Sequence, residues 1–140
     1  MKFGLAIALI FVLAACDNRR GDIVYLPSHY RGWVTIEYNV KGAPALGYLR
    51  GKNLIRVPPS GLVQTSSGRK VGYASDEYWF ESQDGYELRV PEALTVREED
   101  LCEKQTCVLR PIYQSVPTPK TFFYVGSKSQ MEQSTPPDRM

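Results

Sequence analysis

The chain has little of what an enzyme of a familiar class needs. Its 140 residues include one histidine, His29, and no phosphate loop, dinucleotide fingerprint, nucleophile elbow or calcium-loop spacing. Ser28 precedes His29, but neighbours along an extended strand point to opposite faces, so the two do not form a catalytic unit. We therefore expect a protein that is not an enzyme and binds no cofactor or metal, with His29 at the surface.

Two acidic clusters, Asp76-Glu77 and Glu98-Glu99-Asp100, are the remaining candidates for acid–base chemistry. Paired carboxylates act as general acid and base when a fold holds them roughly 5–10 Å apart. Neighbours in sequence do not establish that geometry, and solvated loops and helix starts commonly carry such acids. We expect both clusters to be solvated.

Neither sign of charge is in excess, with 17 basic and 15 acidic residues. Lys2 is the only charged residue before Cys16, which leaves 16 basic and 15 acidic residues from Cys16 onward. A nucleic-acid-binding domain needs a basic surplus gathered on one face. The balance therefore argues against a nucleic-acid partner.

A long apolar run is also missing. The run from Phe3 to Ala15 is too short for a transmembrane helix, which needs roughly 20 apolar residues. Lys2, the apolar run and the small residues before Cys16 follow the order of a secretory signal. Such a signal is either cleaved without lipidation or is the signal of a lipoprotein. With a cysteine in last place, Leu13-Ala14-Ala15-Cys16 resembles the end of a bacterial lipoprotein signal.

This resemblance implies that Cys16 is lipidated and becomes the first mature residue. Such lipoproteins carry three acyl chains, palmitate among them, and several chains hold firmly because each buried methylene contributes about 0.8 kcal/mol. Asp17 after the lipidated cysteine resembles the signal that retains lipoproteins in the inner membrane of many Gram-negative bacteria. We expect a cell-envelope location, at the periplasmic face of the inner membrane in such a host.

Composition divides the chain into four parts. The last part, residues 126–140, has no aliphatic residue except methionine and contains Pro136-Pro137, so we expect it to be disordered. The parts are a signal peptide (1–15), a flexible lipidated tether (16–22), a β-sandwich domain (23–125) and a disordered tail (126–140).

Cys102 and Cys107 are the cysteines left once Cys16 is acylated. An even pair in an oxidising compartment is typical of a disulfide, and closing so small a loop contributes about 2 kcal/mol. A thioredoxin-like redox pair has two intervening residues rather than four. A zinc site would need two more ligands, and His29 is the sole histidine. We predict a structural disulfide.

The strongest strand signal is Trp33–Val40, where apolar residues alternate with polar ones. Ile23–Pro27 ends in proline, which favours an edge strand. Further strands are predicted at Leu54–Val57, Leu62–Ser66, Val71–Tyr73, Glu77–Ser82, Cys107–Tyr113 and Thr121–Val125. The expected fold is mainly β, a two-sheet sandwich of the transthyretin-like or immunoglobulin-like kind with at most one short helix.

Asp84-Gly85 marks a hairpin whose register follows from parity. A two-residue loop would pair Phe80 with Arg89, which mixes apolar and charged residues. A three-residue loop instead pairs Phe80 with Leu88 and Tyr78 with Val90, on one face. We predict the second register, with Gly85 left-handed in a bulge.

The segment Thr95–Glu103 is either a short helix or an irregular loop. Thr95 and Glu98 have the spacing of a capping box, which favours a helix from about Val96 to Glu103. In that helix Leu101 and Cys102 would point inward.

Two blocks of sequence resemble a family of small bacterial exported proteins and lipoproteins of unknown function. The first runs from Tyr30 to Tyr38 and contains the pattern Gly-Trp-Val-x-Ile-x-Tyr, and the second runs from Arg56 to Ser67. The similarity covers roughly residues 23–90. It implies no known activity.

Aromatic residues gather around the predicted hairpin. In the preferred register Trp79 faces away from Tyr78 and Phe80, where it is either exposed or covered by a second layer. If exposed, it would serve with Tyr73 and Tyr86 as a contact for a ligand or a partner. We therefore expect a lipid-anchored interaction module for another envelope protein; the alternatives are a domain that binds cell-wall glycan or peptide and, third, a hydrolase.

Overall fold

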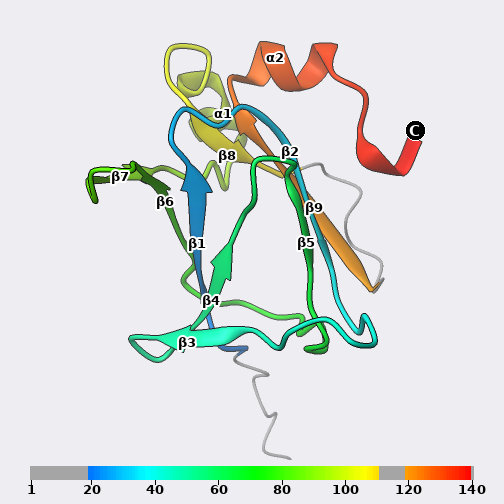
Figure 1. Ribbon diagram of the computed structural model, residues 1–140. Helices are drawn as coiled ribbons and strands as arrows, with labels where there is room; N and C mark the ends of the chain where they lie inside the picture. The colour runs from blue at the N-terminus through cyan, green and yellow to red at the C-terminus, as the bar shows by residue number, and fades with distance from the viewer. Residues whose placement is uncertain (1–18, 111–118, 140) are drawn as a thin grey trace, which may run out of the picture.

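Two mixed β-sheets form the framework of this computed structural model, which describes residues 19–110 and 119–139 (Figure 1). The first sheet has the strand order β3-β4-β1-β6-β7, and the second has the order β5-β2-β9-β8. The strands are β1 (Asp22–Pro27), β2 (Gly32–Glu37), β3 (Gly47–Leu49), β4 (Lys52–Arg56), β5 (Leu62–Gln64), β6 (Glu77–Glu81), β7 (Glu87–Val90), β8 (Cys107–Leu109) and β9 (Lys120–Gly126). The helical segments are α1 (Val96–Leu101), α2 (Lys128–Gln133) and the 3-10 turn η1 (Pro137–Arg139). The mainly-β, sandwich-like prediction is confirmed.

Apolar side chains from both sheets form the core between them. They include Val24, Leu26, Val34, Ile36, Ile55, Val57, Val63, Tyr78, Val90, Val108, Phe123 and Val125. β2 shows how the alternation works, because Val34 and Ile36 are buried while Thr35 and Glu37 are half-buried. β2 ends at Glu37, three residues earlier than predicted, and Asn39 two residues later has a left-handed φ of 58°.

β1 lies in the middle of the first sheet and pairs in parallel with both β4 and β6. The prediction of an edge strand is therefore wrong. Ile23 to Leu26 are all buried, as is typical of a parallel strand covered on both faces. Pro27 is the last residue of the strand, where its missing N–H leaves the preceding ladder intact.

The β6–β7 hairpin confirms the predicted register. Phe80 pairs with Leu88 and Tyr78 pairs with Val90. The Ser82 N–H donates to the Tyr86 carbonyl at 3.0 Å, which leaves a three-residue loop. Gly85 has a φ of 78°, the left-handed conformation expected in this bulge.

The segment that follows β5 differs from the prediction. Val71–Tyr73 form no strand, and no described strand pairs with them. Val71 and Tyr73 are both exposed. β4 and β5 are present but lie in different sheets, so Pro58-Pro59-Ser60-Gly61 carries the chain across the sandwich.

The C-terminal segment, residues 126–139, is ordered and forms α2 and η1, which corrects the prediction of a disordered tail and adds a second α-helix. Ser127 and Gln130 form a capping box at the start of α2. Ser134 accepts a hydrogen bond from the Trp33 indole at 2.8 Å, and Met131 packs on the outer face of the second sheet beside Trp33. Local hydrogen bonds and one aromatic platform therefore order a segment that has no aliphatic core residue.

The predicted flexible tether is also ordered where the structure describes it. Arg19 bonds to distant residues, the Gly21 carbonyl accepts from the Asn53 N–H at 2.9 Å, and Asp22 begins β1. Cys16 and the predicted signal lie outside the described residues. No described helix is long and apolar enough to cross a membrane.

Candidate functional site

A charged cluster lies at the end of the sandwich where the chain enters β1. It consists of Arg19, Asp22, Asp76, Glu92 and Arg110. These residues come from separate segments and line one cleft of about 660 Å³. Figure 1 shows this end of β1 opposite the end that carries α1 and α2.

Asp76 is the centre of the charged cluster. Its carboxylate accepts a hydrogen bond from the Arg19 guanidinium and one from the Asp22 backbone N–H at 2.9 Å. The Arg110 guanidinium lies 3.8 Å away. The Asp76 side chain is only 5% exposed, so the expectation of a solvated acid is wrong at this position. Its partners lie far away in the sequence, where no local pattern reveals them.

Arg110 connects the two sheets. It directly follows β8 of the second sheet, and its Nε donates to Glu92 at 2.7 Å. Its guanidinium also donates to the hydroxyl of Tyr78, in β6 of the first sheet. Burial raises the pKa of Tyr78 far above its usual range. Although burial opposes it, the interactions with Tyr78 and Glu92 raise the pKa of Arg110, so this side chain stays charged.

The five residues of the charged cluster are paired with one another. Burial raises the pKa of Asp22, while Asn53 donates to its carboxylate at 2.8 Å. Within residues 19–110 and 119–139, no three His, Cys, Asp or Glu side chains are placed to hold a metal ion. The cluster thus fixes the N-terminal segment, the loop before β6 and both sheets to one another.

A second hollow, here called the groove, lies at the other end of β1 and has a volume of about 590 Å³. Its walls are the turn at residues 28–31, the β6–β7 hairpin, and Gln105 and Thr106. Phe80 and Val90 line it, as do Tyr86 and Leu88, which are 79% and 67% exposed. His29 lies on its rim and is exposed, as predicted.

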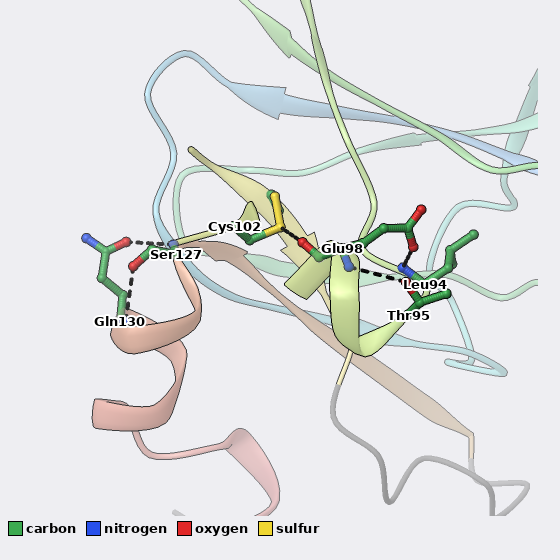
Figure 2. The surroundings of a disulfide bond; sticks show 7 residues. Leu94, Thr95, Glu98, Cys102, Ser127 and Gln130 are labelled. Atoms are coloured by element: carbon green, nitrogen blue, oxygen red, sulfur yellow. Dashed lines mark hydrogen bonds between the residues drawn. A yellow bond between two sulfur atoms is a disulfide. The ribbon is translucent and has the colours of Figure 1, made fainter. Parts of the chain in front are cut away.

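The disulfide between Cys102 and Cys107 is present, which confirms the prediction (Figure 2). Both cysteines are buried against the second sheet, next to Leu109 and Tyr124. The loop that the disulfide closes carries Gln105 and Thr106, so the bond fixes one wall of the groove.

α1 precedes this disulfide, and of the two alternatives for this segment the helix is present. Figure 2 shows Thr95 accepting from the Glu98 N–H, at 3.2 Å, and Glu98 accepting from the Leu94 N–H, at 2.8 Å. Cys102 is buried as predicted. Leu101 is exposed, which corrects its predicted inward position, because the helix ends there after six residues.

The three aromatic residues proposed as contacts lie in three different places. Tyr73 lines the cleft, and Tyr86 lines the groove. Trp79 lines neither hollow and is half-buried, with the Arg89 guanidinium 5.1 Å from its ring centroid. Its indole N–H is buried and has no hydrogen-bond partner among the described residues. The structure therefore does not bring these three aromatics into one site.

The two sequence blocks singled out above pack against each other. β2 of the first block pairs in parallel with β5 of the second. The Thr35 N–H donates to the Gly61 carbonyl at 2.8 Å, and the Tyr30 hydroxyl donates to the Trp33 carbonyl at 2.6 Å beside Gly61. In these contacts the blocks support the architecture of the second sheet.

Residues 19–134 match the family described as "Family of unknown function (DUF6843)". The chain belongs to this family. The DUF6843 match extends well beyond the two blocks at residues 30–38 and 56–67, through α2. No curated protein matches the chain.

The fold of this DUF6843 member is similar to a crystal structure of the "Putative Lipoprotein from Bacillus anthracis". The TM-score is 0.57 at 19% sequence identity, over 89% of this chain and 85% of that one. At this identity the similarity shows a shared fold.

Sequence reasoning missed both hollows. Directly bonded residues of the charged cluster lie up to 57 positions apart in the sequence, as Arg19 and Asp76 do. One signal was available for the groove. The hairpin register places Leu88 opposite Phe80, and Leu88 is an apolar residue between the charged residues Glu87 and Arg89.

Proposed function

We propose that this DUF6843 member is a lipoprotein of the bacterial cell envelope that is anchored through Cys16 and binds another envelope protein. The order of charge, apolar run, small residues and cysteine supports the anchor. The fold similarity to a protein named as a lipoprotein supports the same location. Arg19, three residues after Cys16, is already bonded to the domain through Gly72 and Asp76, which suits a domain held close to a membrane.

The groove is the observation that carries the binding role. β7 is the last strand of the first sheet, and its outer edge pairs with no other described strand. An extended peptide adds to such an edge through main-chain hydrogen bonds, while an adjacent pocket selects its side chains. Tyr86 and Leu88 offer exposed apolar surface that such a segment would bury. The proposed occupant is therefore an extended segment of another envelope protein.

The direction of β1 supports this role. Asp22 at its start belongs to the charged cluster, and Ser28 just after its end lines the groove. Six residues of strand span roughly 20 Å. An anchor at Cys16 would therefore hold the charged cluster near the membrane and present the groove away from it.

The domain is proposed to work without catalysis. The carboxylates of Asp22, Asp76 and Glu92 are engaged by arginine side chains in the cleft. A general acid or base must be within hydrogen-bond reach of its substrate, and these groups instead neutralise one another.

A cell-wall glycan or peptide is the second candidate for the groove. The exposed ring of Tyr86 favours it, because rigid aromatic side chains supply much contact energy. Titration with glycan fragments separates the two readings. A glycan-binding groove binds free glycan fragments, and the Tyr86→Ala variant no longer binds them. A protein-binding groove binds no free glycan fragments.

Site-specific crosslinking in intact cells tests the proposed function. A photoreactive amino acid replaces Leu88 in the full chain with its natural signal. The matched control replaces Leu62, an exposed leucine on β5, which is an edge strand of the other sheet. We expect one dominant protein crosslinked from position 88 and not from position 62, through a short contiguous segment, and its loss when Cys16→Ser releases the chain. Equal crosslinking from both positions would contradict a binding role for the groove.

A further inference from the structure

The loop at residues 69–73 is held against Arg19, the first residue that the structure describes. The Arg19 Nε donates to the Gly72 carbonyl at 2.9 Å. Val71 and Tyr73 flank this glycine and are 58% and 95% exposed. Two exposed apolar side chains, of which Tyr73 is the most exposed large one in the described domain, therefore lie beside the residue that follows Cys16 by three positions.

Chain length limits how far this loop can lie from the anchor. Three residues span at most about 11 Å between the Cα atoms of Cys16 and Arg19. The side-chain bonds of Arg19 to Gly72 and Asp76 remove any slack after that point. If Cys16 carries lipid, Val71 and Tyr73 must lie close to the headgroup layer.

The segment that contains this loop carries charged side chains of one sign. Residues 38–75 contain six basic residues and no Asp or Glu. Arg50 and Lys52 pair with Glu77, and Arg56 pairs with Glu81, but Lys70 is exposed at the tip of the loop. The acids that line the same cleft as Lys70 are Asp22, Asp76 and Glu92, and they are ion-paired with Arg19 and Arg110. An exposed cation beside exposed Val and Tyr therefore meets little local negative charge.

A second aromatic lies on the other side of the chain entry. Tyr48 of β3 is exposed, and the Arg20 guanidinium lies 4.5 Å from its ring centroid. Tyr48 pairs with Asn53 across β3 and β4, and Asn53 pairs with Asp22 at the start of β1. Tyr48 and Tyr73 thus lie at the same end of the sandwich.

We infer that Lys70, Val71, Tyr73, Arg20 and Tyr48 form a surface that rests on anionic lipid headgroups. The inference rests on the proposed lipid anchor and adds to it a defined face of the domain. Tyrosine is enriched at membrane interfaces, and basic side chains near an anionic surface each add to membrane affinity. The surface would hold the sandwich upright on its anchor, with the groove facing the opposite way.

The test compares two exposed tyrosines in the full lipidated chain. Tyr73→Cys and Tyr86→Cys variants are labelled with an environment-sensitive fluorophore and reconstituted in phosphatidylglycerol–phosphatidylcholine vesicles that contain headgroup-labelled quencher lipid. We expect strong quenching at position 73 and little at position 86. Adding Lys70→Gln to Tyr73→Cys should weaken the docked state about fivefold, because it removes one cation from the anionic surface.

Equal quenching at positions 73 and 86, with both chains floating with the vesicles, would overturn the inference and leave the lipid anchor intact. If quenching at position 73 is as strong in pure phosphatidylcholine vesicles as in vesicles that contain phosphatidylglycerol, the role of anionic lipid is overturned. A chain that does not float with vesicles, and whose mass shows no acyl chains, would overturn the proposed anchor and this inference together. Circular dichroism of each variant checks that it is folded.

Discussion

Gly61 is a position where both backbone conformation and packing require glycine. Its φ is 76°, and a Cβ there would lie within van der Waals overlap of the Tyr30 hydroxyl and 2.6 Å from the Trp33 carbonyl. This contact joins the two sequence blocks, so the glycine is needed for the pairing of β2 with β5.

The variant Gly61→Ala should lower the free energy of unfolding by about 3 kcal/mol, which combines left-handed strain with a steric clash. Gly85→Ala is the matched control, because Gly85 has a φ of 78° but nothing within 4 Å of its Cβ position. It should cost only about 1 kcal/mol. Equal losses in chemical denaturation would show that the contact with Tyr30 is unimportant.

Two acids should give the unfolding free energy opposite dependences on pH. Burial raises the pKa of Asp22 above 3.8, so its contribution is present below that pH and is lost as the pH rises through the folded-state pKa. Hydrogen bonds from Gln64 and Lys120 lower the pKa of Glu37 below 4.5. Its contribution is present above that pH and is lost as the pH falls through the folded-state pKa.

Denaturation between pH 3 and pH 7 checks these signs, and that range is roughly where carboxyl groups titrate. Relative to wild type, Asp22→Asn should become more stable as the pH rises. Relative to wild type, Glu37→Gln should become less stable, by a small amount because Glu37 is near solvent. Slopes of the same sign for both variants would refute the pKa directions.

Single residues were predictable from sequence where their partners are near in the chain. Gly85 follows from the hairpin register, and the pair Cys102 and Cys107 follows from spacing and compartment. Asp76 was not predictable, because its partner Arg19 lies 57 residues away in the sequence.

At the scale of elements, local patterns predicted the β6–β7 hairpin and, apart from its last three residues, the strand β2. Pro27 suggested an edge strand for β1, whereas the four consecutive apolar residues before it are typical of a strand buried on both faces, which is what β1 is. The parallel pairs of β1 with β4 and β6 need connections that cross between sheets, which periodicity does not reveal. For α2 a signal was present, since Ser127 and Gln130 have capping-box spacing, but composition alone suggested disorder.

The disulfide should stabilise both its own loop and the base of α2. The Lys128 N–H donates to the Cys102 carbonyl at 3.4 Å, so the loop and α2 are joined. Replacing both cysteines by alanine should lower the free energy of unfolding by about 2 kcal/mol, chiefly through the unfolded chain. Hydrogen exchange should speed up in α2 and at Gln105 and Thr106 before it does in β1.

Intact mass after alkylation gives the control for that experiment. The native chain should take up no label at Cys102 and Cys107 without reductant, and two labels with it. Two labels without reductant would show that the bond does not form in the cell.

At the scale of the whole molecule, the account assigns different roles to the two ends of the sandwich. The charged cluster fixes the chain directly after Arg19, and the groove lies at the far end of β1. Sequence patterns predicted the sandwich, and the compartment stays a prediction. They did not predict either hollow, because each is assembled from segments that only the folded topology brings together.

Lipid anchoring at Cys16 is tested by the mass of the N-terminal peptide from the membrane fraction of cells that produce the full chain. The account predicts a peptide that begins at Cys16, lacks residues 1–15 and carries the added mass of acyl chains. A Cys16→Ser variant should leave the membrane fraction. A peptide that retains residues 1–15, or one that begins after Ala15 without any acyl mass, would contradict lipid anchoring and the orientation derived from it.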